Sequence, residues 1–424
     1  MPYVADLHIH SRFSRACSRD LNIPNLSRWA KFKGIDLLGT GDALHPLWFT
    51  ELKKDLKESS SSGIYEYDNV KFLISFEISC IYSEGGSVRR IHTLVFLPSL
   101  DAAAKLSEAL TKRGANLSSD GRPIVGLSSK QLCEVIFQVE PQALIVPAHI
   151  WTPWFSLYGS NSGYDKFQDC FGEFSDSVLA VETGLSSEPA MNWRVADLDN
   201  KSILSFSDLH SLPRLGREVT IIGGDLDYQS LRQALKDQNI VGTIEFFPEE
   251  GKYHYSGHRN CSIVFSPEDI KEKGEICPKC KRRLTIGVIQ RVEELASRET
   301  DELRLTIHDG VTKSATFPNR AGFRMLVQLE EILAESLKST VSSQKVKNEY
   351  QRLVTTLDPE LKILTKTSLE GISKVAGEKV AEGIERVRQG KLKIEPGFDN
   401  TYGIVKIWGE DEEGKTSDEQ ISLF

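Results

Sequence analysis

The sequence Val4-Ala5-Asp6-Leu7-His8-Ile9-His10, near the start of this 424-residue chain, decides the fold. Residues 4–7 predict a short buried strand that delivers two histidines in an i, i+2 relation. Because alternate residues of a strand point to the same side, His8 and His10 can bind one metal ion. For an isolated His-x-His, one packed and one solvated histidine is an equally good explanation, so the interpretation depends on what recurs downstream.

The same arrangement, a short apolar run that carries a metal-competent side chain, recurs along the first half of the chain. The runs at 35–38, 71–76, 91–97, 143–147, 178–181 and 203–206 carry or precede Asp42, Glu77, His92, His149, Glu182, and Asp208 with His210. Helical stretches such as 25–33, 100–112 and 130–139 separate these runs. Strands that alternate with helices predict βαβ units and a parallel sheet, with the active site at the carboxyl ends of the strands. Capping carboxylates or core histidines explain any one position, but not six equivalent ones.

This order of motifs resembles the polymerase and histidinol phosphatase (PHP) family over about residues 1–245. The resemblance implies a distorted seven-stranded β/α barrel that holds two or three metal ions and hydrolyses phosphoesters. It also implies two sets of ligands. The first metal would be held by His8, His10, Glu77 and Asp208, and Glu77 would bridge to a second metal held by His92 and His149.

A third metal would use Asp42 and His210, and here the chain departs from the family pattern. The family usually has Thr-Asp-His where this chain has Thr40-Gly41-Asp42, and it often has a further histidine where this chain has residues 11–15. A carboxylate in place of an imidazole favours a harder ion. Glu77, Asp208 and His210 are the expected catalytic residues. Glu182 and His45 rank second: Glu182 would orient a ligand, and His45 would stabilise its loop.

A second metal site is predicted beyond about residue 246. Cys261 is followed by the knuckle Cys277-Pro278-Lys279-Cys280, a spacing typical of structural tetrahedral zinc. For the fourth ligand we favour His258 over His254, because it lies nearer Cys261. A redox role for the Cys-x-x-Cys motif is less consistent with the sequence, since no thioredoxin-like strand precedes it.

Two groups of side chains are expected to contact DNA. The first is the basic face of the zinc module, and the second is the aromatic loop that follows His149. Their members are Arg259, Lys279, Lys281, Arg282, Arg283, Arg291, Trp151 and Trp154. The alternatives are a solvated charged face and aromatic side chains that pack the loop down. The formal net charge of −8 argues against general affinity for nucleic acid, but it does not exclude a local basic surface.

The last third of the chain predicts mainly helices. One amphipathic helix should begin at Pro318-Asn319-Arg320 and carry Phe323, Leu326, Leu329, Leu333 and Leu337 on one face; others should cover 346–356 and 368–389. A closing strand pair is expected between 393 and 408. Residues 369–377 weakly resemble a helix-hairpin-helix, although plain helix packing is the better explanation. The expected divisions are 1–245 (barrel), 246–300 (zinc module), 301–408 (helical domain) and 409–424 (disordered acidic tail).

Taken together with the later motifs 284–288 and Ile394-Glu395-Pro396-Gly397, the chain is similar to the endonuclease Q family over residues 1 to about 408. The resemblance implies a metal-dependent endodeoxyribonuclease that cuts duplex DNA on the 5′ side of hypoxanthine, uracil, xanthine or an abasic site. The products would be a 3′-hydroxyl and a 5′-phosphate. The expected cofactors are zinc, with Mg²⁺ or Mn²⁺ for catalysis. A phosphatase of the histidinol-phosphate type is the alternative, but it leaves the zinc module and the helices without a role.

The final residues Gln420-Ile421-Ser422-Leu423-Phe424 follow an acidic stretch with few apolar residues. Gln420, Ile421, Leu423 and Phe424 resemble the anchors of short peptides that dock on DNA sliding clamps. The alternative is that these side chains fold back onto the helical domain. The pentapeptide does not decide between PCNA and the bacterial β clamp.

Composition limits the remaining possibilities. Seven cysteines, an odd number, favour reduced thiols and metal ligands over a disulfide framework. No apolar run approaches the ~20 residues of a membrane span, and no secretory signal is evident. We expect a cytoplasmic monomer that does not associate with membranes.

Overall fold

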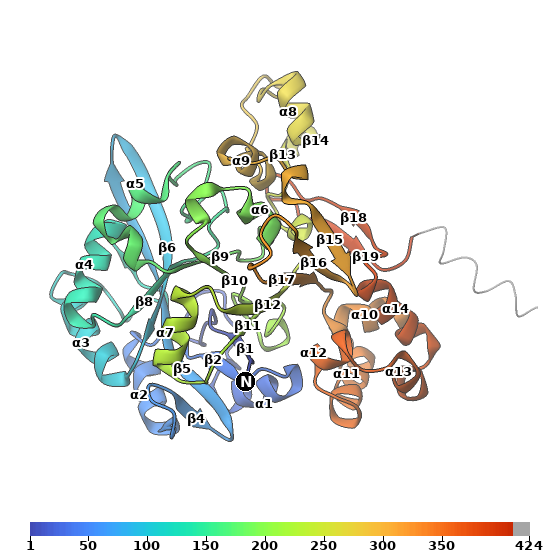
Figure 1. Cartoon of the computed structure of the whole chain (residues 1–424), viewed down its shortest axis with the longest axis horizontal. Helices are drawn as coiled ribbons and strands as arrows, with labels where there is room; N and C mark the ends of the chain where they lie inside the picture. Colours follow the sequence, from blue (N-terminus) through green and yellow to red (C-terminus); the bar gives the residue numbers. More distant parts are fainter. Residues whose placement is uncertain (410–424) are drawn as a thin grey trace, which may run out of the picture.

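The strand β1 (Tyr3–Asp6) lies inside the sheet on which the chain is built (Figure 1). The structure, a computed structural model, describes residues 1–409. The sheet follows the path β15-β16-β17-β12-β11-β1-β2-β5-β4-β3, and β6 and β7 pair with β5 while β8 pairs with β6. Its strands in the first part of the chain are β2 (Leu37–Gly39), β3 (Lys57–Glu58), β4 (Tyr65–Tyr67), β5 (Val70–Glu84), β6 (Ser87–Leu97), β7 (Ile124–Val125), β8 (Leu144–Pro147), β11 (Val219–Ile222) and β12 (Ile240–Glu245).

The strands close around a barrel-like centre. β9 (Ala180–Glu182) and β10 (Ser202–Leu204) form a separate parallel pair, and Ile9 and Leu209 form an isolated parallel bridge beyond the ends of β1 and β10. The helices of this part are α1 (Ile23–Lys33), α2 (Pro46–Asp55), α3 (Leu100–Thr111), α4 (Ser129–Val139), α5 (Phe167–Phe171), α6 (Pro189–Trp193) and α7 (Tyr228–Lys236). Among the helices of residues 1–409, none combines the length and the apolar character that a bilayer span requires.

Local sequence explains these elements. In α1, Asn22 caps the first turn by accepting the N–H of Asn25 at 3.0 Å, and Gly34 ends the helix in the left-handed conformation. In β2, Leu37 faces the barrel interior and Leu38 packs beneath the outer helices. Both side chains are buried, which is why the strands read as continuous apolar runs rather than alternating ones.

The sheet is mixed rather than wholly parallel, which corrects the expectation from the alternating pattern. β1, β2 and β5 are parallel to one another, but β6 runs antiparallel to both β5 and β8, and β11 runs antiparallel to both β1 and β12. The expected strand end at Glu77 is also wrong, because β5 continues through Glu84 to form a long ribbon with β6. Antiparallel neighbours need no crossover helix, so a short connection is sufficient.

The zinc module is a small unit with its own apolar cluster of Phe265, Ile270, Cys277 and Leu284. It contains β13 (Ser256–His258), β14 (Ile263–Phe265) and α8 (Pro267–Lys273), and α9 (Val288–Leu295) leads back to the barrel. In Figure 1 this module and the far end of the β5–β6 ribbon both project toward the top of the view.

The helix expected from Pro318 is wrong in its first half. Residues 322–325 form β17 (Gly322–Met325), which pairs in parallel with β12, and the helix α10 (Leu329–Ser336) begins only after Gln328. Phe323 packs edge to face against Trp193 at 5.7 Å. The open edge of β12 therefore overrides a local pattern that suits a helix. β15 (Leu305–His308) and β16 (Val311–Ser314), which the sequence did not predict, extend the same edge.

The remaining C-terminal elements follow the expectation of helices and a closing strand pair. They are α11 (Gln344–Thr356), α12 (Glu360–Thr365), α13 (Leu369–Ala376), α14 (Glu378–Arg388), β18 (Lys393–Glu395) and β19 (Ile404–Lys406). A buried ion pair joins them to the barrel: Lys33 Nζ of α1 lies 2.5 Å from Glu360 Oε2 of α12. The hydroxyl of Tyr350 donates to the same oxygen at 2.7 Å.

Candidate functional site

The metal-competent side chains converge where β1 ends. Asp6 accepts the backbone N–H groups of Ser207 and Gly216, each at 3.0 Å, and so ties β1 to the segment that carries Asp208. His8 Nε2 lies 3.5 Å from Glu77 Oε2 and 3.4 Å from Asp208 Oδ1. His10 Nε2 lies 3.3 Å and 3.2 Å from the same two oxygens. Two imidazoles and two carboxylates therefore surround one point.

Glu77 turns its other oxygen toward a second pair of histidines. Glu77 Oε1 lies 2.7 Å from His92 Nδ1 and 3.4 Å from His149 Nε2, and these two nitrogens are 3.2 Å apart. His10, Asp208 and His210 form a further group whose ligand atoms lie within 4.8 Å of one another. The two oxygens of Glu77 thus face two different pairs of imidazoles.

The donor atoms fit divalent cations. Within the described residues, His8 Nε2, His10 Nε2, Glu77 Oε1 and Asp208 Oδ1 are buried and have no hydrogen-bond partner. Buried polar atoms are normally paired, so four converging exceptions fit a site that binds a positive ion. Ligands that bind zinc at 2.0–2.2 Å with tetrahedral geometry would stand about 3.4 Å apart. The separations at the first point match that spacing.

Two further carboxylates orient the histidines from behind. Glu182 Oε1 lies 2.8 Å from His8 Nδ1, and Glu182 Oε2 accepts the backbone N–H of His149 at 2.8 Å. Asp42 Oδ1 lies 3.0 Å from His10 Nδ1. A carboxylate on the far nitrogen of a histidine fixes its tautomer and makes the near nitrogen a better metal ligand.

Asp42 therefore does not occupy the place expected of a ligand to a third metal. Its Oδ2 accepts the N–H and the hydroxyl of Ser11, both at 2.6 Å, and the hydroxyl of Ser14 at 2.9 Å. With both oxygens engaged, Asp42 supports His10 and is separate from the groups of ligand atoms. His45, the other second-rank residue, stacks on Phe13 at 4.6 Å and stabilises its loop as expected.

The backbone is strained where it delivers the site. Asp42, His149 and Asp208 have φ values of 48°, 30° and 45°, in the left-handed region that non-glycine residues rarely adopt. The chain is also tightly packed here. A Cβ on Gly184 would lie 2.2 Å from the Cβ of His149, so only glycine fits beside this ligand.

Electrostatics inside the cluster favour the charged forms of the carboxylates. Burial alone would raise the pKa of Glu77, but His92, Arg122 and His8 outweigh it and hold that pKa well below its usual range. Burial lowers the pKa of His92 to about 4, which keeps its imidazole neutral. Anionic carboxylates and neutral imidazoles are the forms that bind metals.

Arg122 is the residue of the site that sequence reasoning missed. Its Nη1 lies 3.1 Å from Glu77 Oε2, and its side chain is 28 % exposed. No motif surrounds it in the sequence, and it reaches the cluster only because residues 120–123 fold back beside β5. Its hydrogen bond to Glu77 places a permanent positive charge at the edge of the metal cluster.

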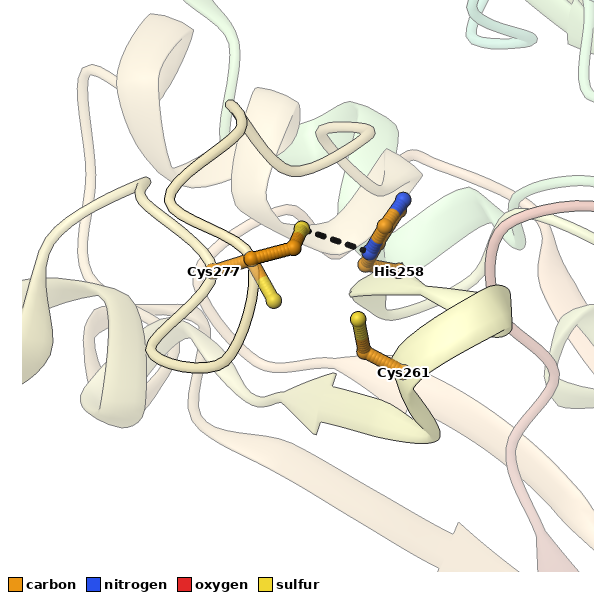
Figure 2. A group of neighbouring side chains, drawn as sticks. His258, Cys261 and Cys277 are labelled. Carbon is orange, nitrogen blue, oxygen red and sulfur yellow. Dashed lines mark hydrogen bonds between the residues drawn. The ribbon is translucent and has the colours of Figure 1, made fainter.

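A second candidate metal site contains His258, Cys261, Cys277 and Cys280, whose ligand atoms all lie within 4.8 Å of one another. Figure 2 shows His258, Cys261 and Cys277 turned toward one another. Cys280 Sγ lies 3.3 Å from His258 Nδ1. Backbone N–H groups of Cys280 and Lys279 overcome the effect of burial and lower the pKa of Cys277 to about 6, toward the thiolate that binds metal. His254 is buried elsewhere, beside the ring of Tyr255.

The basic residues of the zinc module separate into exposed and engaged side chains. Lys279 Nζ donates to the carbonyl of Cys261 at 2.7 Å, and Arg283 pairs with Glu275 at 2.9 Å. Arg259, Lys281 and Arg282 are exposed, and within residues 1–409 their side chains have no hydrogen bond or ion pair.

Arg291 is different, and its expected contact with DNA is corrected. Its side chain, 13 % exposed, pairs with Asp165 and Glu294 and donates to the carbonyl of Tyr158 at 3.0 Å. It therefore ties α9 to the loop after His149.

The aromatic loop is also mainly structural. Trp151 is completely buried and donates its Nε1–H to Asn192 at 2.8 Å, so it has no face for a DNA base, contrary to expectation. Trp154 is only partly buried and packs edge to face against Tyr253 at 5.6 Å.

A cavity of about 710 Å³ opens beside the metal cluster. His149 and Asp208 of the cluster belong to its lining. The other walls come from three separate segments. They include Arg214, Arg217 and Phe246 of the barrel, Tyr253 and His254 of the zinc module, and Glu331 and Tyr402 of the C-terminal part.

Comparison with known proteins agrees with this geometry. The family model described as the MJ0043 C-terminal domain matches residues 328–391. Protein MJ0043 of Methanocaldococcus jannaschii is 32% identical over 265 residues, 61% of this chain, but the chain aligns with only 31% of its length. Protein YqxK of Bacillus subtilis is 29% identical over 95% of this chain and 98% of its own.

Two solved structures match the whole chain. The lesion-specific endonuclease PfuEndoQ from Pyrococcus furiosus is 30% identical, with full coverage of both chains and a TM-score of 0.82. A structure of endonuclease Q in complex with a 27-mer duplex substrate, with an abasic lesion at the active site, is 31% identical and has a TM-score of 0.83. That match covers 99% of this chain and 100% of the other.

The fold and the donor set define a metal-dependent phosphoesterase of the PHP type. The barrel, the zinc-type module and the C-terminal helices continue the similarity over the full length. The chain belongs to the endonuclease Q family. This membership confirms the expected fold class and the expected enzyme class, a metal-dependent DNA endonuclease.

The cysteine site generates a prediction about metal content. Cys277→Ser removes one of four ligands, so the purified protein should contain about one zinc fewer per chain and should melt at a lower temperature. Elemental analysis and thermal unfolding measure the two effects. Cys133→Ala, at a buried cysteine outside the site, is the control and should keep the metal. Equal zinc content in Cys277→Ser and the parent protein would refute the assignment.

Proposed function

We propose that this protein cuts duplex DNA on the 5′ side of a deaminated base or an abasic site. The carrying observation is that His149 and Asp208 of the metal cluster also line a cavity large enough to hold a nucleotide. A PHP-type small-molecule phosphatase would use the cluster, but it would not need the exposed arginines and lysine of the zinc module.

The cavity suits an extruded nucleotide. Deamination changes the Watson–Crick edge of a base, which is hidden inside the duplex, so an enzyme that selects such bases takes them out of the stack. A volume of about 710 Å³ lies within the range of small-molecule sites. Phe246, Tyr253 and Tyr402 supply aromatic surface. Gly184 and Ser186, which also line the cavity, would offer backbone N–H groups to a base carbonyl.

The scissile phosphate would meet Asp208 and His210 first, because they are the more exposed members of the cluster, 23 % and 33 % by side chain. Bound divalent ions would supply an activated water and neutralise charge on the phosphate. In the reaction the water oxygen bonds to phosphorus and the bond from phosphorus to O3′ of the preceding nucleotide breaks. The O3′ leaves with a proton as the 3′-hydroxyl, and the 5′-phosphate stays on the lesion side.

We assign zinc to the cysteine site from its ligand chemistry, since three thiolates and an imidazole in this arrangement are typical of structural zinc. The barrel cluster combines imidazoles with carboxylates, which suits zinc together with Mg²⁺ or Mn²⁺. The monomeric state and the cytoplasmic location remain predictions from the sequence.

The proposed activity is tested with a duplex that carries one deoxyinosine. The protein with Zn²⁺ and Mg²⁺ or Mn²⁺ should nick it on the 5′ side, and an undamaged duplex should stay intact. Asp208→Ala should lower cleavage by at least about a thousandfold, because Asp208 contacts both ends of the His-x-His motif, yet it should still bind the duplex. The exposed residue Asp225 provides the control variant Asp225→Ala. Wild-type protein that fails to nick deoxyinosine, deoxyuridine and abasic duplexes would overturn the proposal.

Glu250 gives the cavity a pH-sensitive wall. Burial, Glu331 and Glu249 together raise the pKa of Glu250 to about 8, although Arg214 and Arg217 oppose the shift. Below that pH the carboxyl is neutral and can donate a hydrogen bond to a base carbonyl. Above it, the anion would stand beside DNA phosphate.

Affinity for the lesion should therefore fall as the pH rises through about 8. Fluorescence anisotropy with the deoxyinosine duplex measures this affinity. The measurement uses the Asp208→Ala variant so that the duplex is not cleaved. Glu250→Gln on the same background should bind with an affinity that stays flat between about pH 7 and about pH 9. The exposed Glu370→Gln serves as the matched control. Identical pH profiles for Glu250→Gln and its parent would contradict the role of Glu250.

The clamp-docking residues Gln420, Ile421, Leu423 and Phe424 lie outside the described residues, so this proposal depends on the sequence alone. Tethering to a clamp would raise the local concentration of the nuclease without a new contact at the active site. Deletion of Gln420–Phe424 should abolish binding to PCNA or the β clamp in a pull-down and leave nicking without clamp unchanged. A truncated protein that still binds the clamp would show that another segment docks.

A further inference from the structure

Arg122 lies in the metal cluster although none of the motifs that define the cluster includes it. Its Nη1 donates to Glu77 Oε2 at 3.1 Å, the oxygen that also faces His8 and His10. Among residues 1–409, its side chain makes no other hydrogen bond or ion pair. A guanidinium has five donors, so most of them remain available on the partly exposed side of the group.

The loop that carries Arg122 is held rigidly. Gly121 donates its N–H to the carbonyl of Phe13 at 3.0 Å, and a Cβ on Gly121 would lie 2.3 Å from Asp42 Oδ2. On the other side, Pro123 accepts the N–H of Ser79, and β7 pairs with β5 beyond Glu77. The continuation of β5 past Glu77 thus provides the partner that fixes Arg122 beside the cluster.

The same loop packs against the place where a third metal ligand was expected. Both oxygens of Asp42 are already engaged by His10, Ser11 and Ser14. Within the described residues, Asp42 is not part of the group of ligand atoms that His210 forms with His10 and Asp208. A permanent cation, Arg122, directly follows Gly121, the residue that packs against Asp42.

We propose that Arg122 is a catalytic residue that donates to a non-bridging oxygen of the scissile phosphate and supplies the third positive charge of the site. This inference rests on the proposed phosphodiester cleavage and names a residue for it. A phosphodiester carries one negative charge, and its transition state gathers more on the phosphoryl oxygens as water attacks and O3′ departs. A fixed guanidinium at that position stabilises the added charge without reorganisation, and no bond forms to Arg122 itself.

The competing role for Arg122 is that of a counter-ion that holds Glu77. The two roles differ in what Arg122→Ala changes. If Arg122 is only a counter-ion, Arg122→Ala should lose metal, and the chains that still hold metal should bind phosphate with unchanged affinity. The proposed role predicts full metal content and weaker binding of the phosphate group.

The test compares wild type, Arg122→Ala, Arg122→Lys and the control Arg15→Ala. Arg15 is matched because it pairs with Asp120 of the same loop at 3.3 Å, but its side chain is 75 % exposed. The measurements are metal content, binding of inorganic phosphate by calorimetry to the metal-loaded protein, single-turnover nicking of the deoxyinosine duplex, and hydrolysis of bis-p-nitrophenyl phosphate. The last two are repeated with added guanidinium chloride.

Arg122→Ala should keep its metal content, bind phosphate at least about tenfold more weakly, and cleave both substrates about 10²–10³-fold more slowly. Added guanidinium should restore part of the cleavage rate that Arg122→Ala has lost. It should not change the cleavage rate of the control Arg15→Ala. Arg122→Lys should be intermediate, because an ammonium keeps the charge without the planar fork. Loss of metal in Arg122→Ala, or phosphate affinity equal to wild type, overturns the inference.

The outcome is separable from that of the proposed function. If wild type hydrolyses bis-p-nitrophenyl phosphate but nicks no lesion duplex, the DNA proposal fails while Arg122 is still tested on the small diester. If wild type nicks the duplex and Arg122→Ala nicks it equally fast, the DNA proposal holds and the role of Arg122 is rejected. Arg122→Lys guards against misfolding of the alanine variant, with melting temperature as the check.

Discussion

The charge of the buried Glu77 carboxylate is the constraint on which the rest of the structure depends. Its side chain is completely enclosed, and each oxygen faces a different pair of histidines. An ionised carboxylate without cations at this depth would cost far more than the few kcal/mol by which domains are stable. The strand ends, the positive φ of Asp208 and His149, and the contact with Arg122 all serve to bring compensating groups to it. Metal binding and ordering of this end of the barrel are therefore coupled.

Sequence reasoning identified the candidate ligands because they belong to local sequence motifs. His8 and His10 share a strand face by geometry, and Asp208-Leu209-His210 repeats the same spacing. The order and direction of the strands were harder to predict, because they depend on pairing partners that lie far along the chain. Phe323 fits an apolar helix face and a strand equally well, and the open edge of β12 decided between them. The continuation of β5 past Glu77 was hidden for a similar reason, since its pairing with β6 extends the ribbon.

The errors within the site have one physical cause: a side chain's role depends on what approaches it from elsewhere. Trp151 and Arg291 are residue types that often contact DNA. Here Trp151 donates a hydrogen bond to Asn192, and Arg291 forms an ion pair with Asp165. Asp42 was expected to bind metal, but its carboxylate is hydrogen-bonded to His10, Ser11 and Ser14. Arg122 carries no motif, and its position follows from the way Gly121 packs on Asp42.

The cavity depends on an interaction distant from the chemistry. Glu360 pairs with Lys33 of the barrel and accepts the N–H of Leu329, the first residue of α10. Two residues later, Glu331 reaches the cavity wall and pairs with Arg214. Because both Lys33 and Glu360 are buried, removing either partner would leave an uncompensated charge at a cost of about 3–5 kcal/mol. The ion pair therefore fixes where the C-terminal helices meet the barrel. The shape of the cavity follows from that attachment as much as from the residues that line it.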